Sequence, residues 1–395
     1  MATESQVAIA PAPRVAIVTG FVAHYKAPFY QRLFERTDVD VHVFCQDTAR
    51  GINLTLVHDR YPDRVTVLPA FSTHRERLVW QRLPWRRLLS QFDVLFVIGN
   101  PRMISGVILA SLASALRRPV VIFGQAHTFG ANPFTERLRL GWWRWFRHLY
   151  VYTDGEAARL KARGFTKHNI VGMNNGLDQR RIDAEAREWT PDRLAAWRTR
   201  QGLDGRTLIL SCARLEAKNR FDTWLEAIPA LLGDHPNLIW GVIGDGVERE
   251  RLERQASALG LADRIRWVGE VTDDSELAPW FLSSRLLVHP SSIGLTLLHA
   301  FGFGVPVVTD DAASWHGPEF DAFEDGRTGR TFPHGSVSGL ADAVRRCLAD
   351  AEALQRMAAR GRQIAREAYN IDVMAERFAA SVRLALPSRF LIPGP

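Results

Sequence analysis

The feature that most constrains the fold of this chain is a regular alternation between short apolar runs and longer amphipathic stretches. Apolar runs rich in β-branched residues occupy residues 15–19, 41–45, 65–68, 94–98, 120–123, 150–153 and 170–173. Amphipathic segments such as residues 28–36 and 104–116 lie between several of them. Near-continuous apolar strands that alternate with helices indicate a parallel sheet with both faces covered.

The same alternation starts again in the second half of the chain, with apolar runs at residues 208–212, 238–243, 265–268, 286–289 and 305–309. At roughly 100–200 residues per domain, 395 residues are enough for two domains. We predict an N-terminal tail over residues 1–13, a Rossmann-like domain over 14–180, a linker over 181–206 with a helix from Pro191, and a second Rossmann-like domain over 207–371. A last helix, residues 372–386, is expected to return to the first domain. Two doubly wound α/β domains then face each other across a cleft, where the carboxyl ends of the strands bind ligands.

Composition excludes several other classes of protein. With 46% hydrophobic and 24% charged residues, most of the chain can form packed cores and is not disordered. Cys45, Cys212 and Cys347 are far apart in the sequence, which argues against a disulfide framework or a zinc knot and favours a reducing compartment. No run reaches 18 apolar residues, and the N-terminus does not resemble a signal peptide. We therefore expect a cytoplasmic protein.

Charge is distributed unevenly between the two halves. Residues 1–190 hold 26 Lys and Arg against 16 Asp and Glu, whereas the remainder holds 24 against 27. A basic half indicates an anionic partner such as nucleic acid, an anionic bilayer or a phosphorylated substrate. The other explanation is a GC-rich genome, which increases the number of arginines. Only four of the 50 basic residues are lysine. Since no helix-turn-helix, zinc or RNP-like motif is present, we expect no nucleic-acid partner.

One segment of the basic half combines arginine with tryptophan. Residues 137–149 contain four arginines, three tryptophans and no acidic residue, with apolar residues at the helically spaced positions 138, 142, 145, 146 and 149. Such a helix either lies on the inner face of a membrane as a peripheral contact or packs its apolar side on the sheet, since a strand begins at Tyr150. Membrane contact would favour a lipid-linked substrate.

Chemistry is concentrated in the second half. Arg214 and Lys218 follow a strand directly, in the turn before a helix, where two cations and unpaired helix N–H groups can neutralise a diphosphate. Gly244 and Gly246 end the next strand, either to make a tight turn or to let a ligand approach the backbone. Their spacing is not that of a dinucleotide fingerprint, so a nicotinamide cofactor is not expected.

A third motif spans residues 289–308. A strand ends at Pro290, and a loop containing Ser292 and Gly294 opens a helix that ends at Gly304. We expect the backbone N–H groups of Gly294, Leu295 and Thr296 to face a phosphate, because the N-terminus of a helix carries partial positive charge.

Taken together, these motifs resemble family 4 retaining glycosyltransferases with the GT-B fold. In the second half the resemblance is carried by RLEAKNRFD, the GDG turn, WVGEV at 267–271 and IGLTLLHAFGFGVPVV. In the first half, HYKAPF at 24–29 resembles the acceptor-side loop of bacterial saccharide transferases, and NGLD at 175–178 resembles a signature that precedes the interdomain linker. The resemblance extends over residues 14–386.

This resemblance implies an enzyme that moves a sugar from a nucleoside-diphosphate sugar to a hydroxyl of a saccharide or lipid-linked acceptor, with the anomeric configuration retained. It places His24 and Tyr25 at the acceptor, His127 over the donor sugar and the loop around Val271 at the nucleobase. Arg214 and Lys218 stabilise the leaving diphosphate, and the sugar nucleotide is a co-substrate rather than a cofactor. Asp38 and Asp40 have the spacing of a metal-binding DxD, but they precede a strand, so we expect no essential metal.

The chain departs from the family pattern at one point. Where such enzymes have two glutamates, this sequence has Ser291 and His299. His299 can still hydrogen-bond a ribose hydroxyl, whereas Ser291 cannot supply a charge. A branch of the family lacks the pair and carries an HGPE segment, found here at 316–319, so Glu319 is either a substitute catalytic carboxylate or a helix-start residue. A nucleotide-sugar epimerase or hydrolase, and a non-catalytic saccharide-binding relic, stay open as alternatives.

Overall fold

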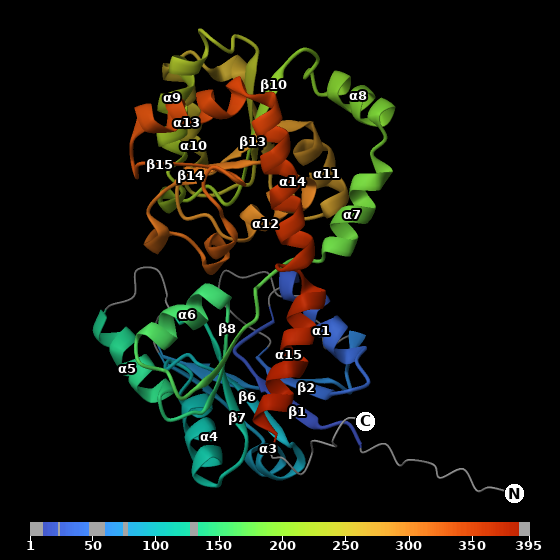
Figure 1. Cartoon of the computed structure of the whole chain (residues 1–395), viewed down its shortest axis with the longest axis vertical. Coiled ribbons are helices and arrows are strands. Elements are labelled where there is room, and N and C mark those ends of the chain that lie inside the picture. The colour runs from blue at the N-terminus through green and yellow to red at the C-terminus, as the bar shows by residue number, and fades with distance from the viewer. Residues whose placement is uncertain (1–10, 23, 47–59, 74–77, 127–132, 387–395) are drawn as a thin grey trace, which may run out of the picture. The chain divides into compact units, whose positions relative to one another are not determined.

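The computed structural model describes residues 11–22, 24–46, 60–73, 78–126 and 133–386. The chain divides into two compact units, which are described separately (Figure 1). The first unit comprises Met1–Met173 and Ile371–Pro395, and the second comprises Asn174–Asn370. No helix in the described part of the chain is both long and apolar enough to cross a bilayer.

The first unit is built on a seven-stranded parallel sheet with the order β3-β2-β1-β6-β7-β8-β9. Strand β1 is an interior strand between β2 and β6, and four of its five residues are buried because both sheet faces are covered. The strands are β1 (Arg14–Val18), β2 (Asp40–Cys45), β3 (Val65–Val67), β6 (Val94–Ile98), β7 (Val120–Gly124), β8 (His148–Val151) and β9 (Asn169–Gly172).

Helices cover the two faces of this sheet in separate cores. Val15 and Ile17 pack in the core beneath α1 and α15, whereas Ala16 and Val18 pack in the core beneath α3, α4, α5 and α6. This division follows from the two-residue period of a strand. The helices are η1 (His24–Lys26), α1 (Ala27–Phe34), α3 (Trp85–Gln91), α4 (Ile104–Ala115), α5 (Pro133–Trp143), α6 (Asp154–Ala162) and α15 (Ile371–Ala385).

The second unit repeats this architecture with a six-stranded parallel sheet in the order β12-β11-β10-β13-β14-β15. Its strands are β10 (Thr207–Cys212), β11 (Leu238–Ile243), β12 (Ile265–Gly269), β13 (Ser284–Val288), β14 (Val307–Asp310) and β15 (Gly329–Phe332). Two doubly wound parallel sheets confirm the predicted α/β class of fold.

Helices of the second unit again form two layers, since one core contains residues of α9, α10 and α13 and the other residues of α7, α8, α11 and α12. The long α14 contributes to both cores, through Leu354 and Ile364. The helices are α7 (Gln179–Glu188), α8 (Pro191–Arg200), η3 (Ala217–Asn219), α9 (Phe221–Ala227), η4 (Ile228–Leu231), α10 (Arg249–Ala258), η5 (Ala262–Arg264), α11 (Asp274–Ser283), α12 (Leu295–Phe303), η6 (Ala313–Trp315), η7 (Pro318–Ala322), α13 (Val337–Ala349) and α14 (Ala351–Glu367).

The division into units differs from the predicted boundaries. Residues 174–180 lie in the second unit, where a Cβ at Gly176 would collide with the backbone of Tyr369. Residues 181–206, predicted as a linker, form most of α7 and α8, because Ile182 and Trp197 pack in the core of that unit. Helix α8 does begin at Pro191, and the Thr190 side chain caps it by accepting the Arg193 N–H.

A second difference concerns the segment rich in arginine and tryptophan. Helix α5 ends at Trp143, so residues 137–149 are not one helix, and Leu149 belongs to β8. Trp143 and Phe146 are buried in the core, whereas the Trp145 side chain is 72% exposed. Both buried rings belong to the same core, and the turn between them is closed by the Phe146 N–H, which donates to the Trp143 carbonyl at 3.1 Å.

Candidate functional site

The loop after β10 brings together the two predicted cations of the second unit. The Arg214 Nη1 and Lys218 Nζ atoms lie 3.1 and 2.8 Å from the two carboxylate oxygens of Glu216. The hydrogen bond from Lys218, with the charge of Arg214, holds the pKa of Glu216 below its ordinary value. Both cations remain solvent-accessible, with Arg214 72% and Lys218 43% exposed. This loop is thus a positively charged surface arranged around one carboxylate.

The GDG turn after β11 supports the cationic loop. Gly244 and Gly246 have φ values of 128° and 156°, and a Cβ at either position would strike the backbone of Ala213 or Leu215. The Leu215 N–H also donates to the Asp245 carbonyl at 2.9 Å. Close packing against the Arg214 loop therefore requires glycine at both positions, and donor binding by Gly244 and Gly246 stays a prediction.

The start of α12 is tied to the end of β10. The Thr296 hydroxyl donates to the Cys212 carbonyl at 2.7 Å, and Gly294 is the N-cap residue. Ser292 has a φ of 58°, which is uncommon for a residue other than glycine. The predicted phosphate-facing N–H groups thus begin a helix that is fixed to the strand preceding Arg214.

His299 lies on α12 and is paired with a carboxylate that sequence reasoning did not identify. The His299 Nε2 atom lies 3.2 Å from Asp274 Oδ1, and the other Asp274 oxygen lies 3.1 Å from Arg181 Nε. The pairing connects α12 to α11. It lies at the position where the family pattern has a glutamate and this chain has His299. Val271 is partly buried against the same core.

Glu319 lies in η7, and its residue is 4% exposed. Its Oε1 accepts a hydrogen bond from the Asn175 side chain, and its Oε2 lies close enough to Gly294 that a Cβ there would be 3.6 Å away. A carboxylate beside the first turn of α12 has the favourable sign for a helix N-terminus. The Asn175 contact also explains why the NGLD signature lies within the second unit.

A network that joins the buried residues His316 and Asp310 to the exposed residue His334 was not predicted. The His316 Nε2 and His334 Nδ1 atoms lie 2.8 and 2.5 Å from the two oxygens of Asp310. The His316 Nδ1 atom accepts the Ile293 N–H at 3.1 Å, and the Gly317 N–H donates to the Ile293 carbonyl at 2.7 Å. The network therefore fixes the residue just before the α12 N-cap. Its only trace in the sequence was the HGPE segment.

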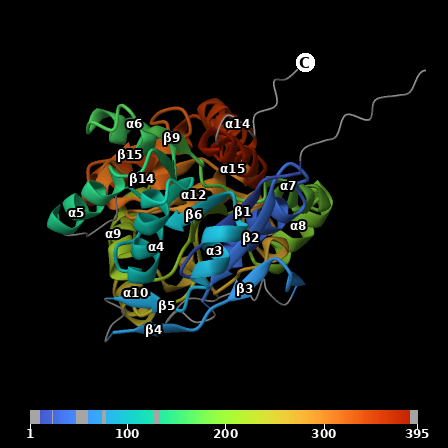
Figure 2. The ribbon, with the colours of Figure 1, turned by 90° about the horizontal axis from the view of Figure 1, so that it is seen from below.

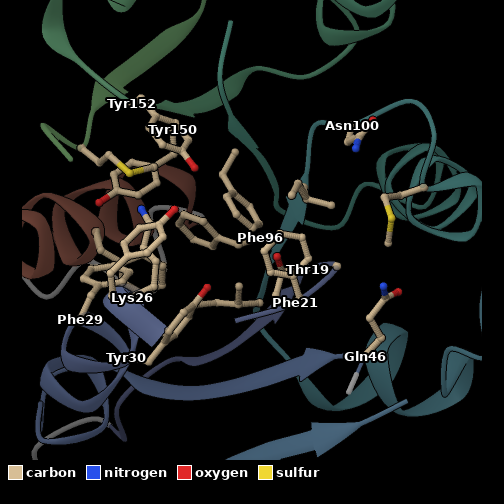
Figure 3. Close-up of a pocket in the computed structure, with 18 of the residues that line it drawn as sticks. Thr19, Phe21, Lys26, Phe29, Tyr30, Gln46, Phe96, Asn100, Tyr150 and Tyr152 are labelled. Carbon is tan, nitrogen blue, oxygen red and sulfur yellow. The ribbon is translucent and has the colours of Figure 1, made fainter. Parts of the chain in front are cut away.

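The first unit contains an aromatic cavity of about 340 Å³ at the carboxyl edge of its sheet (Figure 3). Figure 3 shows Lys26 with Phe29 and Tyr30 on one side of this cavity and Asn100 and Gln46 on the other. Nine aromatic side chains line it: Phe21, Tyr25, Phe29, Tyr30, Phe96, Phe123, Tyr150, Tyr152 and Phe378. A second cavity of about 790 Å³ shares Tyr25 and Tyr152 with it and extends to α5.

Two predicted residues of the first unit cannot be placed in a site. His127 lies outside the described residues, and for His24 only the backbone, in η1, is described. Tyr25 is 38% exposed and lines both cavities. In the described residues, no group of three or more His, Cys, Asp or Glu side chains has the arrangement of a metal site.

Comparison with known proteins supports this organisation. Residues 195–364 match the family model of glycosyl transferases group 1. The chain is 30% identical over 198 residues to an alpha-D-kanosaminyltransferase of Streptomyces kanamyceticus. The aligned region covers 49% of this chain and 50% of that protein. It is 31% identical over 159 residues to a lipopolysaccharide core biosynthesis glycosyltransferase of Rhizobium meliloti. That alignment covers 40% of this chain and 44% of the relative. The chain thus spans about half the length of the curated relatives it matches.

Solved structures extend the likeness to both units. A crystal structure of Anabaena HepE in complex with UDP covers 94% of this chain and 100% of its own, with 16% identity and a TM-score of 0.70. The structure of WaaG, a glycosyltransferase involved in lipopolysaccharide biosynthesis, covers 92% of this chain and 98% of its own, with 17% identity and a TM-score of 0.56. These matches confirm the GT-B fold, and the sequence matches confirm the resemblance to group 1 glycosyltransferases.

Proposed function

We propose that this protein is a retaining glycosyltransferase that moves a sugar from a nucleoside-diphosphate sugar to a hydroxyl group. The proposal rests chiefly on the cationic loop of Arg214 and Lys218, which lies within the span matched by the glycosyl transferase group 1 model. The Thr296–Cys212 hydrogen bond fixes the start of α12 to the strand that carries this loop. Two cations and a helix N-terminus are groups that bind a diphosphate.

Catalysis would then be electrostatic. As the bond from the sugar to the diphosphate breaks, negative charge grows on the leaving phosphate oxygens and positive charge on the sugar ring. Arg214, Lys218 and the N–H groups at Gly294 stabilise the leaving group, a type of contribution worth about 10²–10³ in rate per donor. With retention of configuration, the leaving phosphate itself accepts the proton of the attacking hydroxyl, so the protein needs no separate general base. We propose that no metal ion is required.

Glu216 holds the two cations of the loop in place before a donor binds. Its carboxylate holds both Arg214 and Lys218 within 3.1 Å, so an incoming diphosphate competes with one carboxylate for two preorganised cations. His299 contributes a ring nitrogen to the ribose, and Asp274 orients that ring. Glu319 is too deeply buried to be a favoured catalytic carboxylate, so we assign it to the support of α12 instead.

The acceptor is proposed to bind in the first unit. Its aromatic cavity offers ring faces for a sugar or for the apolar part of a lipid-linked acceptor, and Lys26 and Arg102 supply positive charge. Tyr25, which lines both cavities, is the side chain we assign to acceptor contact. Cys45, Cys212 and Cys347 are far apart in the sequence, which favours the reducing, cytoplasmic location included in this proposal.

A nucleotide panel tests the donor site directly. Thermal unfolding is measured with UDP, GDP, ADP, CMP and dTDP and with their common sugar conjugates. At 100 times its Kd, a bound nucleotide stabilises the protein by about 2.7 kcal/mol, which is readily detected as a rise in Tm. A single responding nucleotide supports the proposal and identifies the donor class. If none responds, and labelled sugar is neither transferred nor released, the non-catalytic alternative replaces it.

A further inference from the structure

Helix α4 of the first unit has an apolar outer surface. Its sequence, ISGVILASLASA, contains no charged residue. Leu109 and Ala113 face the core and are fully buried, but Ile108 and Leu112 point outward and are 43% and 42% exposed. Leu116, which caps the helix, is 56% exposed. A surface helix normally has polar or charged side chains on its outer face, so the exposed apolar residues of α4 indicate a partner.

Neighbouring elements continue this surface. Helix α5 lies beside α4, since the Trp142 Nε1–H donates to Ser111 Oγ at 3.3 Å. The hairpin of β4 (Ala70–Ser72) and β5 (Val79–Gln81) lies on its other side, where the Gln81 N–H donates to Ser105 Oγ at 2.9 Å. Figure 2 shows α4 between α5 and this hairpin. All three elements are therefore adjacent.

Exposed apolar side chains are concentrated on these elements. We define the apolar face as Phe71, Leu78, Trp80, Ile108, Leu112, Leu116, Phe134, Leu138 and Trp145, whose exposures run from 41% to 72%. Among the described residues, eleven large exposed hydrophobic side chains belong to the first unit and three to the second. Single exposed hydrophobic residues need no explanation, but nine on adjoining elements indicate an interaction surface.

The charge around this face has one dominant sign. From residue 94 to residue 153 the sequence holds seven arginines and one acidic residue, Glu136. The Glu136 Oε1 atom accepts a hydrogen bond from Arg163 Nη1 at 2.6 Å, so its charge is offset. Arg137, Arg144 and Arg147 are exposed beside Leu138 and Trp145. A partner of this face must combine an apolar interior with negative charge at its surface.

We propose that the apolar face docks on an anionic lipid bilayer, with its hydrophobic side chains in the interfacial region and its arginines against the headgroups. Tryptophan, phenylalanine and leucine flanked by arginine are the side chains that suit this depth. The surface comprises two helices and a hairpin rather than the single segment 137–149 that the sequence indicated. The proposal rests on the exposed face alone and does not depend on the sugar-transfer chemistry.

Sedimentation with lipid vesicles tests this surface on the full chain. We expect at least tenfold more protein bound to vesicles of phosphatidylcholine with 30% phosphatidylglycerol than to phosphatidylcholine alone, because headgroup charge contributes to binding. Binding should weaken in high salt, which screens the arginines. If the wild-type protein does not sediment with anionic vesicles, the proposal is wrong.

A matched pair of variants localises the contact. Leu112→Asp places a carboxylate in the apolar face, whereas Leu384→Asp changes a leucine that is 51% exposed on α15, which covers the opposite side of the sheet. Leu112→Asp should reduce vesicle binding at least fivefold and Leu384→Asp should leave it unchanged, with both proteins keeping the wild-type Tm within about 3 °C. Equal binding by both variants would overturn the assignment. So would a concentration-dependent dimer that Leu112→Asp abolishes, since the face would then contact a second copy of the chain.

Discussion

Asp310 and His316 form a buried pair, with the His316 Nε2 atom 2.8 Å from Asp310 Oδ1 and both side chains at most 1% exposed. Because His316 Nδ1 accepts the Ile293 N–H, the ring proton is on Nε2 and is donated to the carboxylate. Burial opposes ionisation of Asp310, but hydrogen bonds from His316 and His334 outweigh it and hold the pKa of Asp310 below its ordinary value. The pair therefore connects the end of β14 to the loop that opens α12.

Replacing His316 should destabilise the second unit. His316→Phe leaves the Ile293 N–H and one Asp310 oxygen buried without their partner, and each such loss costs about 1–3 kcal/mol. For a unit of this size we expect Tm to fall by roughly 5–15 °C. His235→Phe, a half-buried histidine outside the network, serves as the control. Equal Tm values for the two variants would show that the network adds no stability.

The cations of the loop after β10 should matter for turnover rather than for folding. Arg214→Ala and Lys218→Ala each remove a charge that faces the leaving diphosphate, so we expect kcat to fall at least tenfold with little change in Tm. Arg254→Ala is the control, because Arg254 has the same 72% exposure as Arg214 and is paired with Glu250 on α10. Wild-type kinetics in both loop variants would remove the diphosphate assignment.

Much of this fold could be predicted from apolar runs, because a strand buried on both faces must be apolar at nearly every position. Strand β11, with all six residues buried, is such a run. The short β4 was not predicted, since it is exposed at two of three positions and so has no buried run. Strand β15 has only Gly329 and Phe332 buried. Edge and hairpin strands of this kind depend on tertiary pairing that no local pattern encodes.

The site shows the same division between local and distant information. Arg214, Glu216 and Lys218 lie in one turn, so their meeting could be predicted from spacing. By contrast, Asp274 and His299 are 25 residues apart and on different helices. Their pairing depends on how α11 packs against α12, which sequence periodicity alone cannot supply.

The Asp274–His299 pair should affect donor binding more than the chemical step. We expect His299→Ala to raise the donor KM about fivefold, because the loss of one hydrogen bond costs about 1 kcal/mol. The kcat should stay within twofold of wild type. Asp274→Asn should produce a smaller rise in KM, because the ring remains but is less firmly oriented. Steady-state kinetics with varied donor measures both. A fall in kcat at unchanged KM would place His299 in the chemical step instead.

Metal removal tests the proposed electrostatic mechanism. If Arg214, Lys218 and the α12 N–H groups neutralise the diphosphate, activity should stay within twofold of its starting value after dialysis against EDTA. Added Mn²⁺ or Mg²⁺ should then give no more than a twofold gain. Activity that disappears with EDTA and returns with Mn²⁺ would contradict the proposal, and Tm measured in parallel would separate that result from unfolding.

His289 should make the stability of the protein dependent on pH. The residue follows β13, is 2% exposed and has the ionisable side chains of His316 and Asp310 as neighbours, and burial lowers the pKa of His289 to about 3. In the unfolded chain its pKa is about 6.5, so between these values the unfolded state binds a proton that the folded state does not. The contribution of neutral His289 to stability is therefore complete above pH 6.5 and is lost as the pH falls toward 3.

The effect can be isolated with His289→Gln, which cannot titrate. One such histidine changes the free energy of unfolding by at most about 1.4 kcal/mol per pH unit, so between pH 6.5 and 4.5 the wild-type protein should lose roughly 2–3 kcal/mol more stability than the variant. His42 and His148, whose pKa values burial also lowers, to about 4, titrate in both proteins and cancel in the difference. Denaturant unfolding at several pH values gives the two slopes. Parallel curves would mean that His289 accepts a proton in the folded protein, and that its side chain reaches water or an acceptor in solution.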